Sequence, residues 1–248
     1  MSEVNSTFLH PCNPWVVVWW SAAFPGLGQL HLGRYVSGLI VFIWELTSNS
    51  FAHINTAIFY SLTGQFQLAK EVLNKEWLMA YVIAYVFAMW VSYESTVEMN
   101  KLSVLADREE STITPMVLAN ASINYLAKRK PGLAAVWSAF APGMGQLYSQ
   151  RIFFGFFLAI FWLFLIIQSN LFEAAYFTMV GDFKQSKAVL DLQWLLFMPS
   201  IYGFGIYNAY VYAASINKIY ETEQARYLKK NYQPPGFRWM NGVKKVGV

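Results

Sequence analysis

Long apolar runs alternate with short stretches of mixed polarity along this 248-residue chain. Four of the runs approach the roughly 20 residues that a helix needs to cross the hydrocarbon core of a bilayer. One of them, IFFGFFLAIFWLFLII, contains no charged residue at all. The pattern therefore predicts an all-α integral membrane protein with long apolar helices at 35–52, 77–93, 152–167 and 194–214.

A shorter apolar segment precedes the first and the third of these runs, and each ends in the same phrase. The phrase reads FPGLGQLHLGR at 24–34 and APGMGQLYSQR at 141–151. Proline interrupts a helix and glycine loosens the backbone, so we expect each phrase to form the corner of a re-entrant or interfacial hairpin. The glutamines are expected to satisfy backbone groups exposed at the break, and the arginines to mark the level of the lipid phosphates. The residues of this hairpin motif are Pro25, Gly26, Gly28, Gln29 and Arg34, with Pro142, Gly143, Gly145, Gln146 and Arg151.

The two phrases belong to a longer internal repeat. Pro25 and Pro142 are 117 residues apart, and at that offset 14–101 aligns with 131–218 without a gap, with 26 identities among 88 pairs. Such a match predicts two tandem repeats. Each comprises the hairpin segment, a transmembrane helix, an amphipathic helix on the membrane surface and a second transmembrane helix. The expected division is a tail (1–13), a first unit (14–101), a connector (102–130), a second unit (131–218) and a basic tail (219–248).

The distribution of charge indicates how the chain crosses the membrane. Residues 101–131 carry five basic and three acidic side chains, and 217–248 carry seven basic and two acidic ones. Because cytoplasmic segments are enriched in Lys and Arg, the connector and the tail are expected in the cytoplasm. Four crossings satisfy this arrangement. The alternative is six crossings with inverted repeats, which would place the basic tail outside.

Composition narrows the classes of function. Only 13% of the residues are charged, whereas soluble domains carry about 25%. The single cysteine, Cys12, excludes an intrachain disulfide, and the familiar catalytic and phosphate-binding motifs are absent. We therefore expect no enzyme, cofactor or metal site. The net charge of +4 is explained by attraction of the basic tail to anionic lipid headgroups rather than by nucleic acid.

Three carboxylates lie in or near the apolar runs. Glu45 is near the middle of the first run, and Glu94 and Glu98 are four residues apart near the end of the second. An ionisable group inside a membrane is costly, so these three residues form a candidate polar membrane site for a cation or a proton. The alternative is that Glu94 and Glu98 pair with Arg34 or Lys101 while Glu45 bonds to a neighbouring helix. Asn208 is expected to make an interhelical hydrogen bond.

The phrase P-G-x-G-Q-x-Y-x-G resembles a signature of small bacterial membrane domains of the two-helix-hairpin kind, several of them uncharacterised. The second copy has Tyr148 but Gln150 where glycine is expected; the first keeps Gly33 but has His31 for tyrosine. The resemblance implies a compact hairpin in a bacterial cell membrane, and no catalytic residues. We therefore expect a multi-pass membrane scaffold or accessory subunit that binds another membrane protein or itself. The alternative is a small cation- or proton-linked transporter or channel acting as an oligomer.

Overall fold

The structure, a computed structural model, describes residues 11–109 and 128–233, and all regular secondary structure in that part is helical. The predicted all-α class is confirmed, with 83% of the described residues in helices. The first half of the chain contains α1 (Pro14–Ala23), α2 (Leu27–His31), α3 (Tyr35–Ala52), α4 (Ile54–Leu62), α5 (Phe66–Val72) and α6 (Lys75–Arg108). The second half contains α7 (Pro131–Phe140), α8 (Met144–Tyr148), α9 (Ile152–Gln168), α10 (Leu171–Val180), α11 (Phe183–Val189), α12 (Leu192–Leu195) and α13 (Met198–Tyr232).

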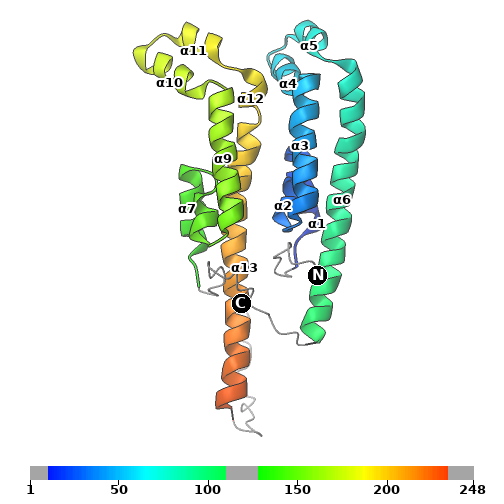
Figure 1. The fold of residues 1–248 in the computed structure, drawn as a ribbon, viewed down its shortest axis with the longest axis vertical. Coiled ribbons are helices and arrows are strands. Elements are labelled where there is room, and N and C mark those ends of the chain that lie inside the picture. The colour runs from blue at the N-terminus through cyan, green and yellow to red at the C-terminus, as the bar shows by residue number, and fades with distance from the viewer. Residues whose placement is uncertain (1–10, 110–127, 234–248) are drawn as a thin grey trace, which may run out of the picture.

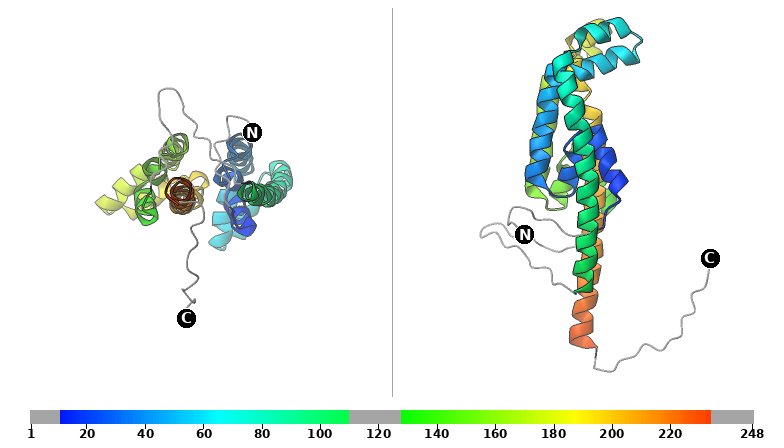
Figure 2. Two further views of the ribbon diagram at one scale, coloured as in Figure 1. Left: turned by 90° about the horizontal axis from the view of Figure 1, so that it is seen from below. Right: turned by 90° about the vertical axis from the view of Figure 1, so that its right-hand side faces the viewer.

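The two halves stand side by side as two bundles (Figure 1). In each, the long helices run along the long axis of the molecule, and the short helices α4 and α5, or α10 and α11, gather at one end. The hairpins α1–α2 and α7–α8 lie lower down, beside the long helices. Helices α6 and α13 extend furthest at the opposite end (Figures 1 and 2). Both halves therefore point the same way.

One helix in the described residues, α6, is by itself long and apolar enough to cross a membrane, over Lys75–Ala106. The number of candidate spans rises to three if two bent pairs are each counted as one span. One pair is α9 with α10, bent by 57°; the other is α11 with the stretch Leu192–Tyr232, which contains α12 and α13, bent by 82°. The 18-residue α3 does not qualify, since Glu45, Ser48 and Asn49 lower its mean hydropathy. These lengths and compositions are compatible with a location in a membrane.

The P-G phrase breaks the helix instead of kinking it. Helix α1 ends at Ala23, Phe24 is extended, and Gly26 has a φ of 100° before α2 begins; Gly143 has a φ of 103° at the equivalent place. A Cβ at Gly26 would lie 2.7 Å from the carbonyl oxygen of Gly38 in α3. Glycine is therefore required twice over, for its backbone conformation and for the contact between the corner and α3.

The mixed stretches differ from the prediction of one amphipathic helix after a glycine. Those predicted helices are α5 and α11, but α4 and α10 precede them. Gly64 and Gly181, with φ of 77° and 88°, separate the two members of each pair. The polarity pattern missed α4 and α10 because they continue the apolar character of α3 and α9 after a sharp turn at His53 or Asn170, both in the left-handed conformation.

The predicted ends of the two units, Lys101 and Lys218, both fall inside helices. Helix α6 continues to Arg108 and α13 to Tyr232, because the polar residues beyond the apolar part are good helix formers with compatible charges. Glu223 and Arg226 form an ion pair at 2.8 Å within α13. The basic residues Lys244 and Lys245 of the predicted tail, and most of the connector, lie outside the described residues.

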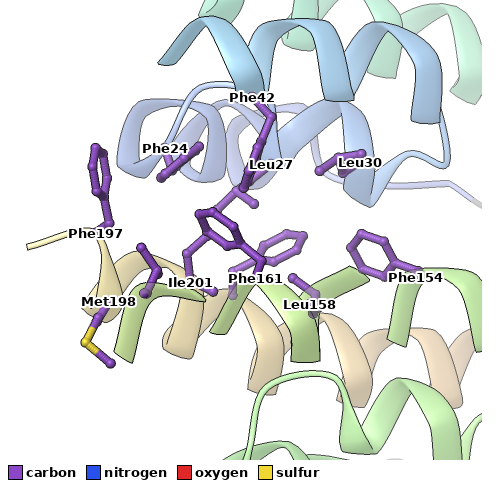
Figure 3. Close-up of a cluster of buried hydrophobic side chains, with 12 residues drawn as sticks. Phe24, Leu27, Leu30, Phe42, Phe154, Leu158, Phe161, Phe197, Met198 and Ile201 are labelled. Atoms are coloured by element: carbon purple, nitrogen blue, oxygen red, sulfur yellow. The ribbon is translucent and has the colours of Figure 1, made fainter. Parts of the chain in front are cut away.

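The apolar core lies between the two halves, at the interface that we call the seam (Figure 3). The ring of Phe24 lies 4.6 Å from that of Phe42 and 5.5 Å from that of Phe197, and Phe42 lies 4.7 Å from Phe161. Both halves therefore contribute rings to one packed cluster. Its members are Phe24, Leu27, Leu30, Phe42, Phe154, Leu158, Phe161, Leu165, Phe197, Met198, Ile201 and Phe204.

Candidate functional site

A buried polar network crosses the seam near the short helices. Gln193 of α12 donates from Nε2 to the side-chain oxygen of Asn49 at 2.8 Å, and its Oε1 accepts from Thr56 at 3.1 Å. Asn55 donates to the backbone oxygen of Gln193 at 2.9 Å and accepts from Asn49 at 3.2 Å. We call Asn49, Asn55, Thr56 and Gln193 the amide clamp. It ties α3 and α4 of the first half to α12 of the second.

Glu45 joins the amide clamp from one turn earlier on α3. Its Oε1 accepts from Asn49 at 2.9 Å and from the hydroxyl of Tyr81 in α6 at 3.4 Å. The residue is 3% exposed, and its second oxygen, Oε2, is buried without a hydrogen-bond partner. A buried polar atom without a partner is uncommon and calls for an explanation such as a bound ion, a water or a functional role.

The other two predicted carboxylates lie elsewhere. Glu94 and Glu98 are both exposed, and Glu98 approaches Arg34 at 4.0 Å, at the start of α3. Arg34 precedes Glu45 by eleven residues, or about 16 Å along a helix. The structure therefore does not bring Glu45, Glu94 and Glu98 into one site. For Glu98, pairing with Arg34 is the alternative that the geometry supports.

A second polar network crosses the seam at the opposite end of α9. Arg151, the N-cap residue of α9, donates to Asn208 of α13 at 3.1 Å and to the hydroxyl of Tyr35 of α3 at 2.8 Å. Asn208 also bonds to Nδ1 of His31 at 2.9 Å, and Gln146 lies 3.4 Å from its side-chain oxygen. The interhelical hydrogen bond expected of Asn208 is confirmed, and we call these five residues the arginine network.

The motif glutamines clamp each hairpin to a long helix and do not cap the break. Gln146 donates to the backbone oxygen of Gly205 at 2.8 Å, and Gln29 donates to that of Ala88 at 3.3 Å. Ala88 and Gly205 are equivalent positions of α6 and α13. The expectation that these amides serve the broken backbone is therefore wrong. Each hairpin orients its glutamine so that the side-chain amide N–H donates to a backbone carbonyl oxygen inside the neighbouring long helix.

The motif glycines bring the two arms of each hairpin together. A Cβ at Gly28 would lie 2.7 Å from the carbonyl oxygen of Val17 in α1. At Gly145 it would overlap the carbonyl oxygen of Ala134 in α7. Together with the glutamine clamps, these contacts account for the P-G-x-G-Q phrase by packing and hydrogen bonding alone.

Sequence reasoning found Glu45, Asn208 and both arginines, but it missed the amide clamp. The signal that could have found it is the polar run Thr47, Ser48 and Asn49 at the end of an otherwise apolar helix, with Asn55 shortly beyond. Gln193 gives no such signal, because it lies in a mixed stretch beside Asp191.

Among the described residues, no group of three or more His, Cys, Asp or Glu side chains is placed to hold a metal ion. Comparison with known proteins gives no assignment: no family model, no curated protein and no solved structure matches this chain.

Proposed function

We propose that the protein is a non-enzymatic, multi-pass membrane scaffold that assembles with further copies of itself through surfaces at its two outer edges. The proposed topology has four spans, built around α3, α6, α9 and α13, in two tandem repeats of parallel orientation. The connector and the C-terminal tail lie in the cytoplasm. Apolar side chains that face outward support the membrane location: Ile83 is 75% exposed on α6 and Phe153 is 77% exposed on α9.

The observation that carries the proposal is the way the two halves pack. At the seam, Trp20 of α1 lies against Phe204 and Tyr207 of α13, with ring centroids 5.3 and 5.2 Å apart. The equivalent of Phe204 in the first half is Phe87 and that of Tyr207 is Trp90, both on α6. These two side chains are 59% and 58% exposed.

The other surface of the seam is also duplicated. The equivalent of Trp20 in the second half is Trp137 of α7, which is 47% exposed. Near it, Phe140 is 80% exposed. The α6 face of one molecule and the α7 face of another therefore repeat the two surfaces that meet at the seam. An interface of this head-to-tail kind can be continued by further copies, giving a ring or a row.

The test is disulfide cross-linking in native membranes. In a Cys12→Ser background, Phe87→Cys and Trp137→Cys should form a disulfide between copies when present together. Phe153→Cys, which is more exposed than Trp137 (77% against 47%) but lies on α9, replaces Trp137→Cys in the control pair. Equal yields for the two pairs would refute self-association through these faces. Cross-linking of Phe87→Cys to a different membrane protein would instead identify an accessory subunit.

A second candidate function, a cation- or proton-linked transporter acting as an oligomer, is favoured by the buried Oε2 of Glu45. If this function is correct, Glu45→Gln abolishes flux in proteoliposomes while Glu94→Gln, which alters an exposed carboxylate, leaves it intact. Unchanged flux in Glu45→Gln would remove this candidate. The packed rings of the seam favour the scaffold, because they fill the centre of the molecule with apolar side chains.

A further inference from the structure

Arg151 is a cation buried at the seam. The residue is 9% exposed, and its guanidinium lies 4.5 Å from the ring centroid of Phe154 and 4.4 Å from that of Tyr212. Its hydrogen bonds go to Asn208 and Tyr35, which are both neutral. Burying a charge is costly unless an opposite charge accompanies it, and an arginine keeps its charge in proteins.

The equivalent arginine of the first half, Arg34, has a negatively charged partner, and Arg151 has none among the described residues. Arg34 lies 4.0 Å from the carboxylate of Glu98 and bonds to Ser95. In the second half, the residues at the positions of Glu98 and Ser95 are Ser215 and Tyr212. Among the residues that the structure describes, no carboxylate forms an ion pair with Arg151.

We propose that Arg151 binds the phosphate group of an anionic phospholipid. The inference rests on the proposed membrane topology, in which Arg151 begins a span at the level of the cytoplasmic headgroups, and it does not depend on the scaffold role. The first backbone N–H groups of the 17-residue α9 follow Arg151 directly, and no side chain caps them. The end of a helix that carries free N–H groups favours a negative charge.

The surroundings favour a lipid over free phosphate. Ile152 and Phe153, the next residues along the chain, are 38% and 77% exposed. A phosphate held at Arg151 by a lipid would leave its acyl chains beside these apolar side chains. Planar guanidinium groups match the geometry of phosphate oxygens. The hydroxyl of Tyr35 accepts from Nη2 of Arg151 at 2.8 Å, so its own O–H group remains to donate to an anion bound beside the guanidinium.

The experiment is native mass spectrometry of the full chain in detergent, with added phosphatidylglycerol, with phosphatidylcholine, and with inorganic phosphate. The wild-type chain should retain one phosphatidylglycerol in preference to phosphatidylcholine. Arg151→Gln should lower that affinity ten- to a hundred-fold, the range for loss of a charge-assisted hydrogen bond.

The decisive variant is Ser215→Glu, which places a carboxylate where the first half has Glu98. The chain should remain folded, and the lipid should be lost to a similar extent because the cation is neutralised internally. The reciprocal Glu98→Ser should add a second, weaker lipid at Arg34. Equal retention of phosphatidylglycerol by the wild type, Arg151→Gln and Ser215→Glu would overturn the proposal. Retention of inorganic phosphate by the wild type with no preference for phosphatidylglycerol would overturn it too.

Discussion

Gly28→Ala tests whether the P-G-x-G-Q phrase is a packing device. Gly28 lies in α2 with an ordinary helical backbone, so alanine introduces no conformational strain and the effect is steric. The new Cβ would lie 2.7 Å from the carbonyl oxygen of Val17 and 3.0 Å from the hydroxyl of Ser92, and would overlap that of Ser21. Ordinary contact begins at 3.4 Å, so α2 must move away from α1 by about 0.7 Å.

Two terms contribute to the expected loss of stability. Forcing one extra carbon into a packed interior costs about 1–3 kcal/mol. The upper part of that range applies here, because a backbone oxygen cannot rotate away. The new Cβ also displaces the hydroxyl of Ser21 and so breaks its 2.6 Å hydrogen bond to Ser92, a kind of bond worth about 0.6–1.7 kcal/mol between membrane helices. The total is a loss of about 3–5 kcal/mol.

The assay is unfolding of the purified chain by titration with a denaturing detergent. Gly203→Ala is the matched control, since it lies inside α13 and its Cβ would meet nothing closer than 3.7 Å, the distance to Trp20. It should change stability by less than about 1 kcal/mol. Gly145→Ala should reproduce the loss seen for Gly28→Ala, because the same contact occurs in the second half. If Gly28→Ala and Gly203→Ala were equally stable, the steric account of the motif would be wrong.

The remaining predictions concern the amide clamp and the start of α1. Gln193→Leu removes four hydrogen bonds across the seam and should lower the stability of the fold by about 1–3 kcal/mol. Gln67→Leu, at an exposed position of α5, is the control and should leave stability unchanged. Thermal unfolding measures both variants, and equal melting temperatures would refute the role of the amide clamp. Burial raises the pKa of the Cys12 thiol from 9.0 to about 11, so alkylation of Cys12 should keep accelerating up to about pH 11; a rate that levels off near pH 9 would contradict this. Asn100→Ala removes hydrogen bonds to the backbone N–H and C=O of Cys12, at 2.9 and 2.8 Å, and should speed alkylation at pH 8, with Asn217→Ala as the control in the other half.

The sequence was informative where a residue type has a narrow set of structural uses. Proline and glycine at Pro25 and Gly26 predict a break, and the break is present with Gly26 at positive φ. The run at 35–52 predicts a helix, and α3 has those bounds. Local composition carries this information, because helix interruption and helix continuation depend on neighbouring residues.

Residues whose partners are distant in the sequence could not be assigned in the same way. Gln193 contacts Asn49, 144 residues earlier, and nothing in a mixed stretch distinguishes a buried amide from an exposed one. The glutamines of the hairpin motif were assigned to the nearest unsatisfied groups, whereas their partners are carbonyl oxygens 59 residues away. Glu94 and Glu98 share one face of α6, as their spacing predicts. Their separation from Glu45 along the helix axis depends on how α3 and α6 pack against each other, which the sequence does not give.

Several residues that are identical at equivalent positions of the two halves make the same contact within each half. The bonds of Gln29 and Gln146 are equivalent, and so are those of Tyr85 to Ala22 and of Tyr202 to Ala139, at 2.8 and 2.7 Å. Because each hairpin must pack against its own long helix, both copies need the same residues for this task.

Residues that differ between equivalent positions of the two halves make most of the polar contacts across the seam. Tyr35, which bonds to Arg151, has Ile152 as its equivalent, and Asn49, which bonds to Gln193, has Ile166. If the two halves were identical, each of these polar groups would also occur on an outer surface of the molecule. In the proposed membrane location that surface faces lipid, which offers no hydrogen bond. Divergence at these positions therefore gives the seam its polar specificity while keeping the outer faces apolar. The aromatic residues Phe204 and Tyr207 of the seam, by contrast, have aromatic equivalents on α6, Phe87 and Trp90. The outer face of α6 therefore has the aromatic packing surface of the seam but lacks the polar residues that make the contact between the two halves specific.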